Sequence, residues 1–382
     1  MEKDLGLKTA VRRLFWRWGY TTKVDVGLRT VVGEQNGGGS ENETFTDLDV
    51  LGLHVGSDLA LRISVADCKT SPRRSTERMF WLRGVADFFG ADEALLIRQY
   101  EVTRASRALA ARLRLAVATE VDLAELEEGA PSGLVLEGGA LSLLFDLDRV
   151  VAYRAARAAV DAKLRPLVEY LEFDYWLYPE HRNLQQLIAH LQEAAPILVP
   201  RNPVHASLFV QATWSYLISI AQAVQHIRRV HVTDQDKLLR AYLFGGESGL
   251  RDKERLAATL RHMTGRLPAD RPDRDVLPPY YPPMLELVTR YVGKPHKIQP
   301  GLRYAEWLAE ALIAKERSTV PEAFGSDFDD IAAKLLLDVS RLLALGAGLD
   351  NQFVDGMTKR LVIRATDLPL PKDDQVPPST AS

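Results

Sequence analysis

Two neighbouring segments of this chain, residues 45–53 and 61–69, alternate in the way that is typical of β-strands. Successive side chains of a strand point to opposite sides, so alternate residues share one face. One face of the first segment carries Phe45, Asp47, Asp49, Leu51 and Leu53, and one face of the second carries Leu61, Ile63, Val65, Asp67 and Lys69. If the segments pair as a hairpin about residues 56–58, both Asp49 and Asp67 can reach one cation, with Lys69 beside Asp67.

The same patterns divide the chain into regions. Residues 1–128 predict an α/β unit, with helices over 5–18, 76–89 and 103–119, strands over 23–32 and 93–99, and a polar loop over 33–43. Residues 129–136 predict a linker, because 129–133 read GAPSG. The polar, proline-containing residues 366–382 predict a disordered tail. We expect residues up to about Glu128 to fold alone and to keep metal binding.

Residues 137–365 predict a mainly α-helical domain without a catalytic signature. The expected helices cover 141–171, 183–194, 205–231, 233–243, 253–265, 284–292, 303–317 and 327–345. An aromatic stretch at 173–181, FDYWLYPEH, could stack on bases, although such a stretch more often belongs to a core and a turn.

Composition sets limits on the class of protein. The chain has 382 residues, of which 46% are hydrophobic, so it is long enough for two or three domains. One cysteine, Cys68, excludes an internal disulfide framework, and the chain begins without a secretory signal, which favours the cytoplasm. The longest apolar stretch, 206–224, is interrupted by polar residues and indicates a buried helix, so no membrane partner is expected.

The pattern of aspartate and lysine indicates divalent-metal chemistry. Mg²⁺ prefers oxygen ligands and keeps several waters, so one or two carboxylates plus substrate phosphate oxygens complete its shell. Asp49 and Asp67 meet that need, and Lys69 offers a point charge to the attacking water or the phosphate. The side chain of Cys68 lies on the other strand face and is expected in the core.

The order helix, strand, Asp-bearing strand, Asp-Xaa-Lys strand, helix, strand resembles the PD-(D/E)XK nuclease superfamily, most closely its Mrr-like restriction endonuclease branch. The resemblance covers the first third of the chain and rests on LFWRWGY (14–20), TDLDVLG (46–52), VADCKT (65–70) and ALLI (94–97) followed by the helix from Thr103. It implies a restriction-endonuclease-like fold. It also implies Mg²⁺ or Mn²⁺ at Asp49, Asp67 and the main-chain carbonyl of Cys68, with Lys69 acting on the water.

The chain departs from the resemblance in two places. The Asp-Xaa-Lys triplet, residues 67–69, begins with Asp67 where Mrr-like proteins often have Glu or Gln. The first helix lacks the acidic residue that many relatives place there, because Glu2 and Asp4 come too early, and this puts a second metal in question. Asp47 and Glu43 are further candidates for positions just outside the metal's own ligands.

The nucleic-acid contact has to come from local clusters, because the net charge is −3. The candidates next to the triplet are Arg73, Arg74, Arg78 and Arg83. A second group, Arg104, Arg107, Arg112 and Arg114, reads equally well as a solvated face.

These observations lead to one principal hypothesis and two rivals. We expect a divalent-metal-dependent endonuclease that hydrolyses DNA, with RNA not excluded, in restriction or anti-phage defence. The helical region would recognise, sense, dimerise or bind a partner subunit. The first rival is a catalytically silent nuclease-fold protein that binds nucleic acid or acts as a scaffold, and the second is a structure-specific DNA repair nuclease.

Overall fold

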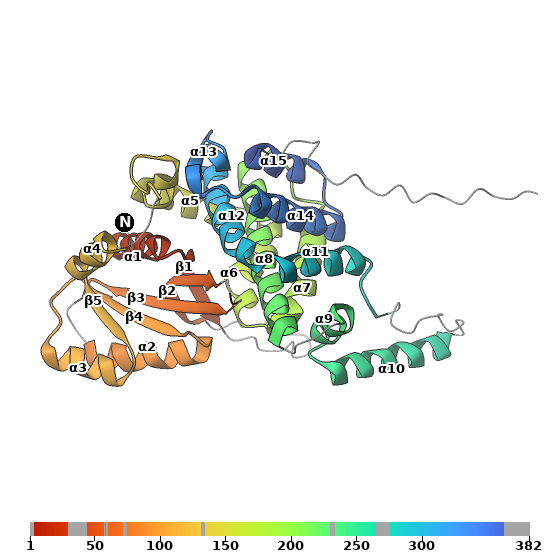
Figure 1. Ribbon diagram of the computed structural model, residues 1–382, viewed down its shortest axis with the longest axis horizontal. Helices are drawn as coiled ribbons and strands as arrows, with labels where there is room; N and C mark the ends of the chain where they lie inside the picture. The colour runs from red at the N-terminus through yellow and green to blue at the C-terminus, as the bar shows by residue number, and fades with distance from the viewer. Residues whose placement is uncertain are drawn as a thin grey trace, which may run out of the picture.

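A computed structural model describes residues 4–29, 44–56, 58, 60–71, 75–130, 134–229, 234–264 and 276–362. An N-terminal sheet with its covering helices lies against a larger array of helices (Figure 1). The whole 33–43 loop with Glu43, the arginines Arg73 and Arg74, and the expected tail fall outside the described residues.

The sheet has five strands in the order β1-β2-β3-β4-β5. The strands are β1 (Thr21–Arg29), β2 (Thr44–Val55), β3 (Leu61–Lys69), β4 (Glu93–Arg98) and β5 (Ala116–Thr119). The pairs β1/β2 and β2/β3 are antiparallel, whereas β3/β4 and β4/β5 are parallel. The expected layout of an α/β sheet followed by a mainly helical region is confirmed.

Helices cover both faces of this sheet (Figure 1). The first face carries α1 (Leu5–Arg17) and α4 (Glu120–Glu128), and the second carries α2 (Ser75–Phe89) and α3 (Arg104–Arg112). Cys68 is buried in the cluster that joins α1 to the sheet, as its strand parity predicted. Val65, two residues before Asp67, belongs instead to the cluster that contains Met79 of α2.

The single helix expected over 103–119 is wrong. The structure ends α3 at Arg112 and starts β5 at Ala116. Arg114 between them has φ 54°, a left-handed conformation that a helix does not continue through. Ala-Val-Ala-Thr then pairs with β4, because the neighbouring sheet edge supplies hydrogen bonds that helix periodicity does not reveal.

The helical region is built around α8 (Pro203–Arg229), a long and largely buried helix. The other helices are α5 (Leu147–Ala158), α6 (Arg165–Glu172), α7 (Glu180–Ala194), α9 (Gln235–Leu243), α10 (Glu247–Thr264), α11 (Tyr281–Gly293), α12 (Ile298–Ile313), α13 (Val320–Phe324), α14 (Asp330–Ala347) and α15 (Gln352–Leu361). Short 3₁₀ turns cover Ala140–Leu144, Ala162–Leu164, Asp174–Trp176, Pro295–Lys297 and Gly325–Asp327.

The continuous helix expected over 141–171 is also wrong. It is split into a 3₁₀ turn, α5, a second 3₁₀ turn and α6. The Asp146 carboxylate accepts a hydrogen bond from the Arg149 N–H and begins α5, and Asp161 does the same for the Lys163 N–H. Pro166 then sits in the first turn of α6, where its missing N–H costs nothing.

The sheet and the helical region share one hydrophobic core. Trp16, Val26 and Leu48 from the first region belong to the same cluster as the buried residues of α8 and α12. Leu134 and Leu136, which fall in the segment expected to be a linker, are buried as well. The described part of the chain contains no helix long and apolar enough to cross a membrane.

Candidate metal and phosphate site

Asp49 and Asp67 lie where β2 and β3 separate. The paired residues run from Val55↔Leu61 to Val50↔Ala66, and the next residue on each strand is the aspartate. Both residues are 2% exposed. Beyond this point β2 continues beside β1, with Asp47 opposite Gly27. The two buried aspartates therefore follow directly on the last residue pair of β2 and β3.

Lys69 bridges the two carboxylates. Its Nζ lies 3.4 Å from Asp49 Oδ2 and 3.5 Å from Asp67 Oδ1. Burial alone would lower the pKa of Lys69, but the charges of Asp67 and Asp49 outweigh it, and the pKa is raised. The ammonium group is thus held protonated between the two aspartates that the sequence singles out.

Asp49 has two further donors. Its Oδ2 accepts a hydrogen bond of 2.7 Å from the Cys68 N–H, and its Oδ1 lies 3.0 Å from Nζ of Lys8 on α1. Burial opposes ionisation, but Lys8 and Lys69 outweigh it, and the pKa of Asp49 is lowered. Asp49 is therefore the firmly ionised carboxylate of the site.

Lys8 was missed by sequence reasoning, although a signal exists. Val11 and Arg12 follow Lys8 at the i+3 and i+4 positions, so the three side chains share the buried face of α1. Lys8 is 2% exposed. A lysine is almost never buried unless it is paired. Its ammonium group is 2.7 Å from Asp25 as well as close to Asp49.

Asp67 is held by Arg78 of α2. The guanidinium group binds both carboxylate oxygens, with Nε 2.7 Å from Oδ2, and it lies 3.4 Å from the centre of the Trp81 ring. Burial raises the pKa of Asp67 despite the contacts with Arg78 and Lys69. Arg78, which was expected to contact nucleic acid, pairs with Asp67, because a buried carboxylate needs a partner, while 26% of its side chain stays exposed.

Arg83 is the other described arginine of the expected cluster. It lies one turn further along α2 and pairs with Asp87, with 3.0 Å between Nε and Oδ2. This i, i+4 pair is on the surface, so Arg83 can exchange its partner at little cost.

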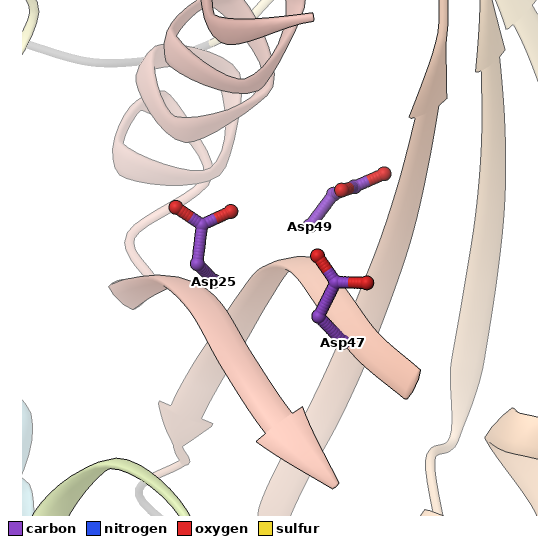
Figure 2. Close-up of side chains that lie close together, drawn as sticks. All are labelled: Asp25, Asp47 and Asp49. Carbon is purple, nitrogen blue, oxygen red and sulfur yellow. The ribbon is translucent and has the colours of Figure 1, made fainter. Parts of the chain in front are cut away.

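A second group of carboxylates adjoins Asp49 (Figure 2). One oxygen each of Asp25, Asp47 and Asp49 lies within 4.8 Å of the others, a spacing that could hold a metal ion. Asp25 comes from β1 and has φ 57°, a left-handed conformation that aspartate tolerates better than most residues. Asp47, expected just outside the ligands, joins the cluster, whereas Asp67 does not.

The main chain of Cys68 also faces the site. In a β-strand, the N–H and the C=O of one residue point to the same side, towards the same neighbouring strand. The Lys69 carbonyl accepts from Gln99 beside β4, and the Cys68 N–H donates to Asp49 on the other side. The Cys68 carbonyl therefore points towards β2, while burial raises the pKa of its thiol.

No known protein family, curated protein or solved structure matches this chain.

Proposed function

We propose that this chain is a divalent-metal-dependent nuclease of the PD-(D/E)XK type that hydrolyses phosphodiester bonds of DNA. The observation that carries the proposal is the position of Lys69, within 3.5 Å of both Asp49 and Asp67 where two strands separate. The element order around this site supports the restriction-endonuclease-like fold that the sequence resemblance implies.

The residues present fit a hard cation such as Mg²⁺ or Mn²⁺. Asp49, Asp67 and the Cys68 carbonyl would hold one ion, and Asp25 and Asp47 offer carboxylates for another ion that shares Asp49. When bound, the metal lowers the pKa of a water and stabilises charge on the scissile phosphate. Lys69, whose pKa is raised, would stay protonated and donate a hydrogen bond to the water or to a phosphate oxygen.

The substrate and the biological role rest on the resemblance to Mrr-like nucleases. DNA in restriction or anti-phage defence is the role that resemblance implies. The helical region, which covers β1 and shares a core with it, would then select the target or bind a partner.

A catalytically silent protein is the second candidate, and one observation favours it. Each carboxylate of the triplet site already has protein cations: Lys8 and Lys69 hold Asp49, and Arg78 and Lys69 hold Asp67. A metal ion would have to displace Lys8 or Arg78. A silent protein would keep these ion pairs and bind nucleic acid without cutting it.

A cleavage assay separates the two candidates. Linear, circular, single-stranded and branched DNA, and RNA, are incubated with the full chain in Mg²⁺, Mn²⁺ or EDTA. We expect metal-dependent cleavage that Lys69→Met reduces by at least ~100-fold, the scale of losing one preorganised charge stabiliser. Lys237→Met, which removes an exposed lysine of α9, is the control and should cut normally.

Three results would count against the nuclease. Cleavage in the presence of EDTA, or normal cleavage by Lys69→Met, would show that the active site is not at Asp49, Asp67 and Lys69. Nucleic-acid binding without cleavage under any metal supports the silent protein instead. Cleavage restricted to branched DNA would point to a structure-specific repair nuclease.

A further inference from the structure

A cavity of about 670 Å³ lies between β1 and the helices α5, α6, α8 and α12. Lys23, Asp25 and Gly27, at alternate positions of β1, form part of its wall, and Asp47 lies opposite Gly27 on β2. Its volume falls within the roughly 300–1,000 Å³ of small-molecule sites. The cavity thus adjoins the acidic cluster of Asp25, Asp47 and Asp49 while extending into the helical region.

One part of the cavity wall is aromatic and apolar. Phe173 and Trp214 line it, together with Val160 and Val168. The Phe173 ring lies directly on β1 at Gly27, where an added Cβ would be 2.0 Å from a ring atom. The absence of a side chain at Gly27 therefore places an aromatic ring beside the acidic cluster.

Another part of the wall carries more positive than negative charge. Among the described residues Lys23 forms no ion pair with a carboxylate, and its ammonium group donates to the Leu171 carbonyl. The neighbouring Arg157 pairs with Glu172, with 2.7 Å between Nη2 and Oε1. Of these two cations, Arg157 has a carboxylate partner among the described residues and Lys23 does not.

Three other carboxylates of the cavity wall already pair with arginines. Glu306 and Glu310 bind Arg12, with 2.8 and 2.6 Å between its Nη2 and their Oε1 atoms. At the Asp25 side, Arg154 pairs with Asp25. An anionic group next to Lys23 and Arg157 would therefore meet one cation, Lys23, that no described carboxylate pairs with.

We propose that this cavity binds a nucleotide, with its base against Phe173 and Trp214 and its phosphate between the Lys23–Arg157 pair and the acidic cluster. Aromatic side chains stack on bases of any sequence. Phosphate oxygens bind both to cations and to a divalent metal that one or two carboxylates hold. The proposal stands on the cavity and does not require Lys69 or Asp67.

Such a nucleotide can have two sources, a free mononucleotide or a nucleotide flipped out of a strand. Titration calorimetry of the full chain with dAMP and dTMP in Mn²⁺ tests the first source. A duplex carrying 2-aminopurine tests the second, because unstacking in the pocket changes its fluorescence. Thymidine and inorganic phosphate separate the base contribution from the phosphate contribution.

We expect saturable mononucleotide binding or a 2-aminopurine signal, at least tenfold weaker in Lys23→Met. Ala158 lines the cavity at an exposed position of α5, so a larger side chain there should not disturb the hydrophobic core. Ala158→Phe should therefore fill part of the cavity and block binding. Lys237→Met is the matched control and should bind normally. Circular dichroism establishes that each variant is folded.

Two outcomes overturn the proposal: absence of both signals in the folded wild-type chain, or signals that Lys23→Met and Ala158→Phe leave unchanged. Lys69→Met distinguishes this proposal from the nuclease itself. If that variant binds the nucleotide normally and no variant cleaves DNA, the cavity proposal stands while the proposed catalysis fails.

Discussion

Two clusters of charged side chains differ in how far their cationic members are exposed to solvent. In the junction cluster, Arg12 of α1 binds Glu306 and Glu310 of α12, and the three side chains are 5, 5 and 9% exposed. In the site cluster, Asp49 and Asp67 are similarly buried, and so is one partner, Lys8, at 2%, but the partners Lys69 and Arg78 are 29 and 26% exposed. The first cluster joins two regions, whereas the second opens at the end of a strand pair.

The difference in solvent exposure indicates that the two clusters have different roles. Glu306 accepts hydrogen bonds from Trp16, Thr21 and Thr22 in addition to Arg12, so every change there leaves a buried group without a partner. Lys69 and Arg78 reach solvent and can move aside for a metal ion or a phosphate. We therefore interpret the junction cluster as structural and the site cluster as exchangeable.

The largest effect is expected from separating the two regions. A fragment of residues 1–128 loses Glu306 and the core contacts of Trp16, Val26 and Leu48. The shared core leads us to expect that this fragment stays unfolded, contrary to the autonomous folding that the linker pattern suggested. Circular dichroism and limited proteolysis of the isolated fragment test this prediction. A cooperative melting transition would show that the fragment folds without the junction cluster.

The next effect is confined to the junction cluster. Arg12→Met should lower the free energy of unfolding by about 3–5 kcal/mol, because it leaves two carboxylates buried without their cation. Lys69→Met should change it by only ~1 kcal/mol, since Asp49 keeps Lys8 and Asp67 keeps Arg78. Urea unfolding of the two variants measures both values, and equal losses would remove the distinction between the clusters.

Metal titration should affect the site cluster alone. Mn²⁺ at about 100 times its Kd should stabilise the chain by about 2.7 kcal/mol. Arg78→Leu should bind Mn²⁺ more tightly, because it frees Asp67, whereas Arg83→Leu, on the surface of the same helix, should behave as wild type. Thermal unfolding with increasing Mn²⁺ checks this order, and a full Mn²⁺ effect in Asp49→Asn would place the ion elsewhere.

The strand-borne part of the site was predictable because a period of two fixes which side chains share a face. Asp49, Asp67 and Lys69 come together as the parity of 45–53 and 61–69 predicted. The partners Lys8 and Asp25 were missed, because they reach the site through the packing of α1 and the left-handed backbone at Asp25. Neither the crossing of a helix over a sheet nor a single unusual φ leaves a periodic signal.

Element boundaries show the same limit. Long buried helices such as α8 were predicted to within a few residues, since their apolar pattern is extended. The fifth strand, α13 and α15 are short and draw their stability from neighbours that are distant in sequence. The junction cluster likewise joins residues almost 300 positions apart, which local patterns cannot reveal.

The smallest effect concerns pH and Lys23, which lines the same cavity as the junction cluster. The pKa of Lys23 is about 7 in the folded chain and 10.5 in its ordinary state, so the unfolded chain binds more protons between these values. Stability should therefore rise with pH in this window, by about 2 kcal/mol from pH 7 to 9, and stay level below about pH 6, where both states are protonated. Lys23→Met should lack this rise while Lys237→Met keeps it, as urea unfolding at several pH values can measure. A wild-type slope equal to that of Lys23→Met would show that the pKa of Lys23 is not lowered in the folded chain.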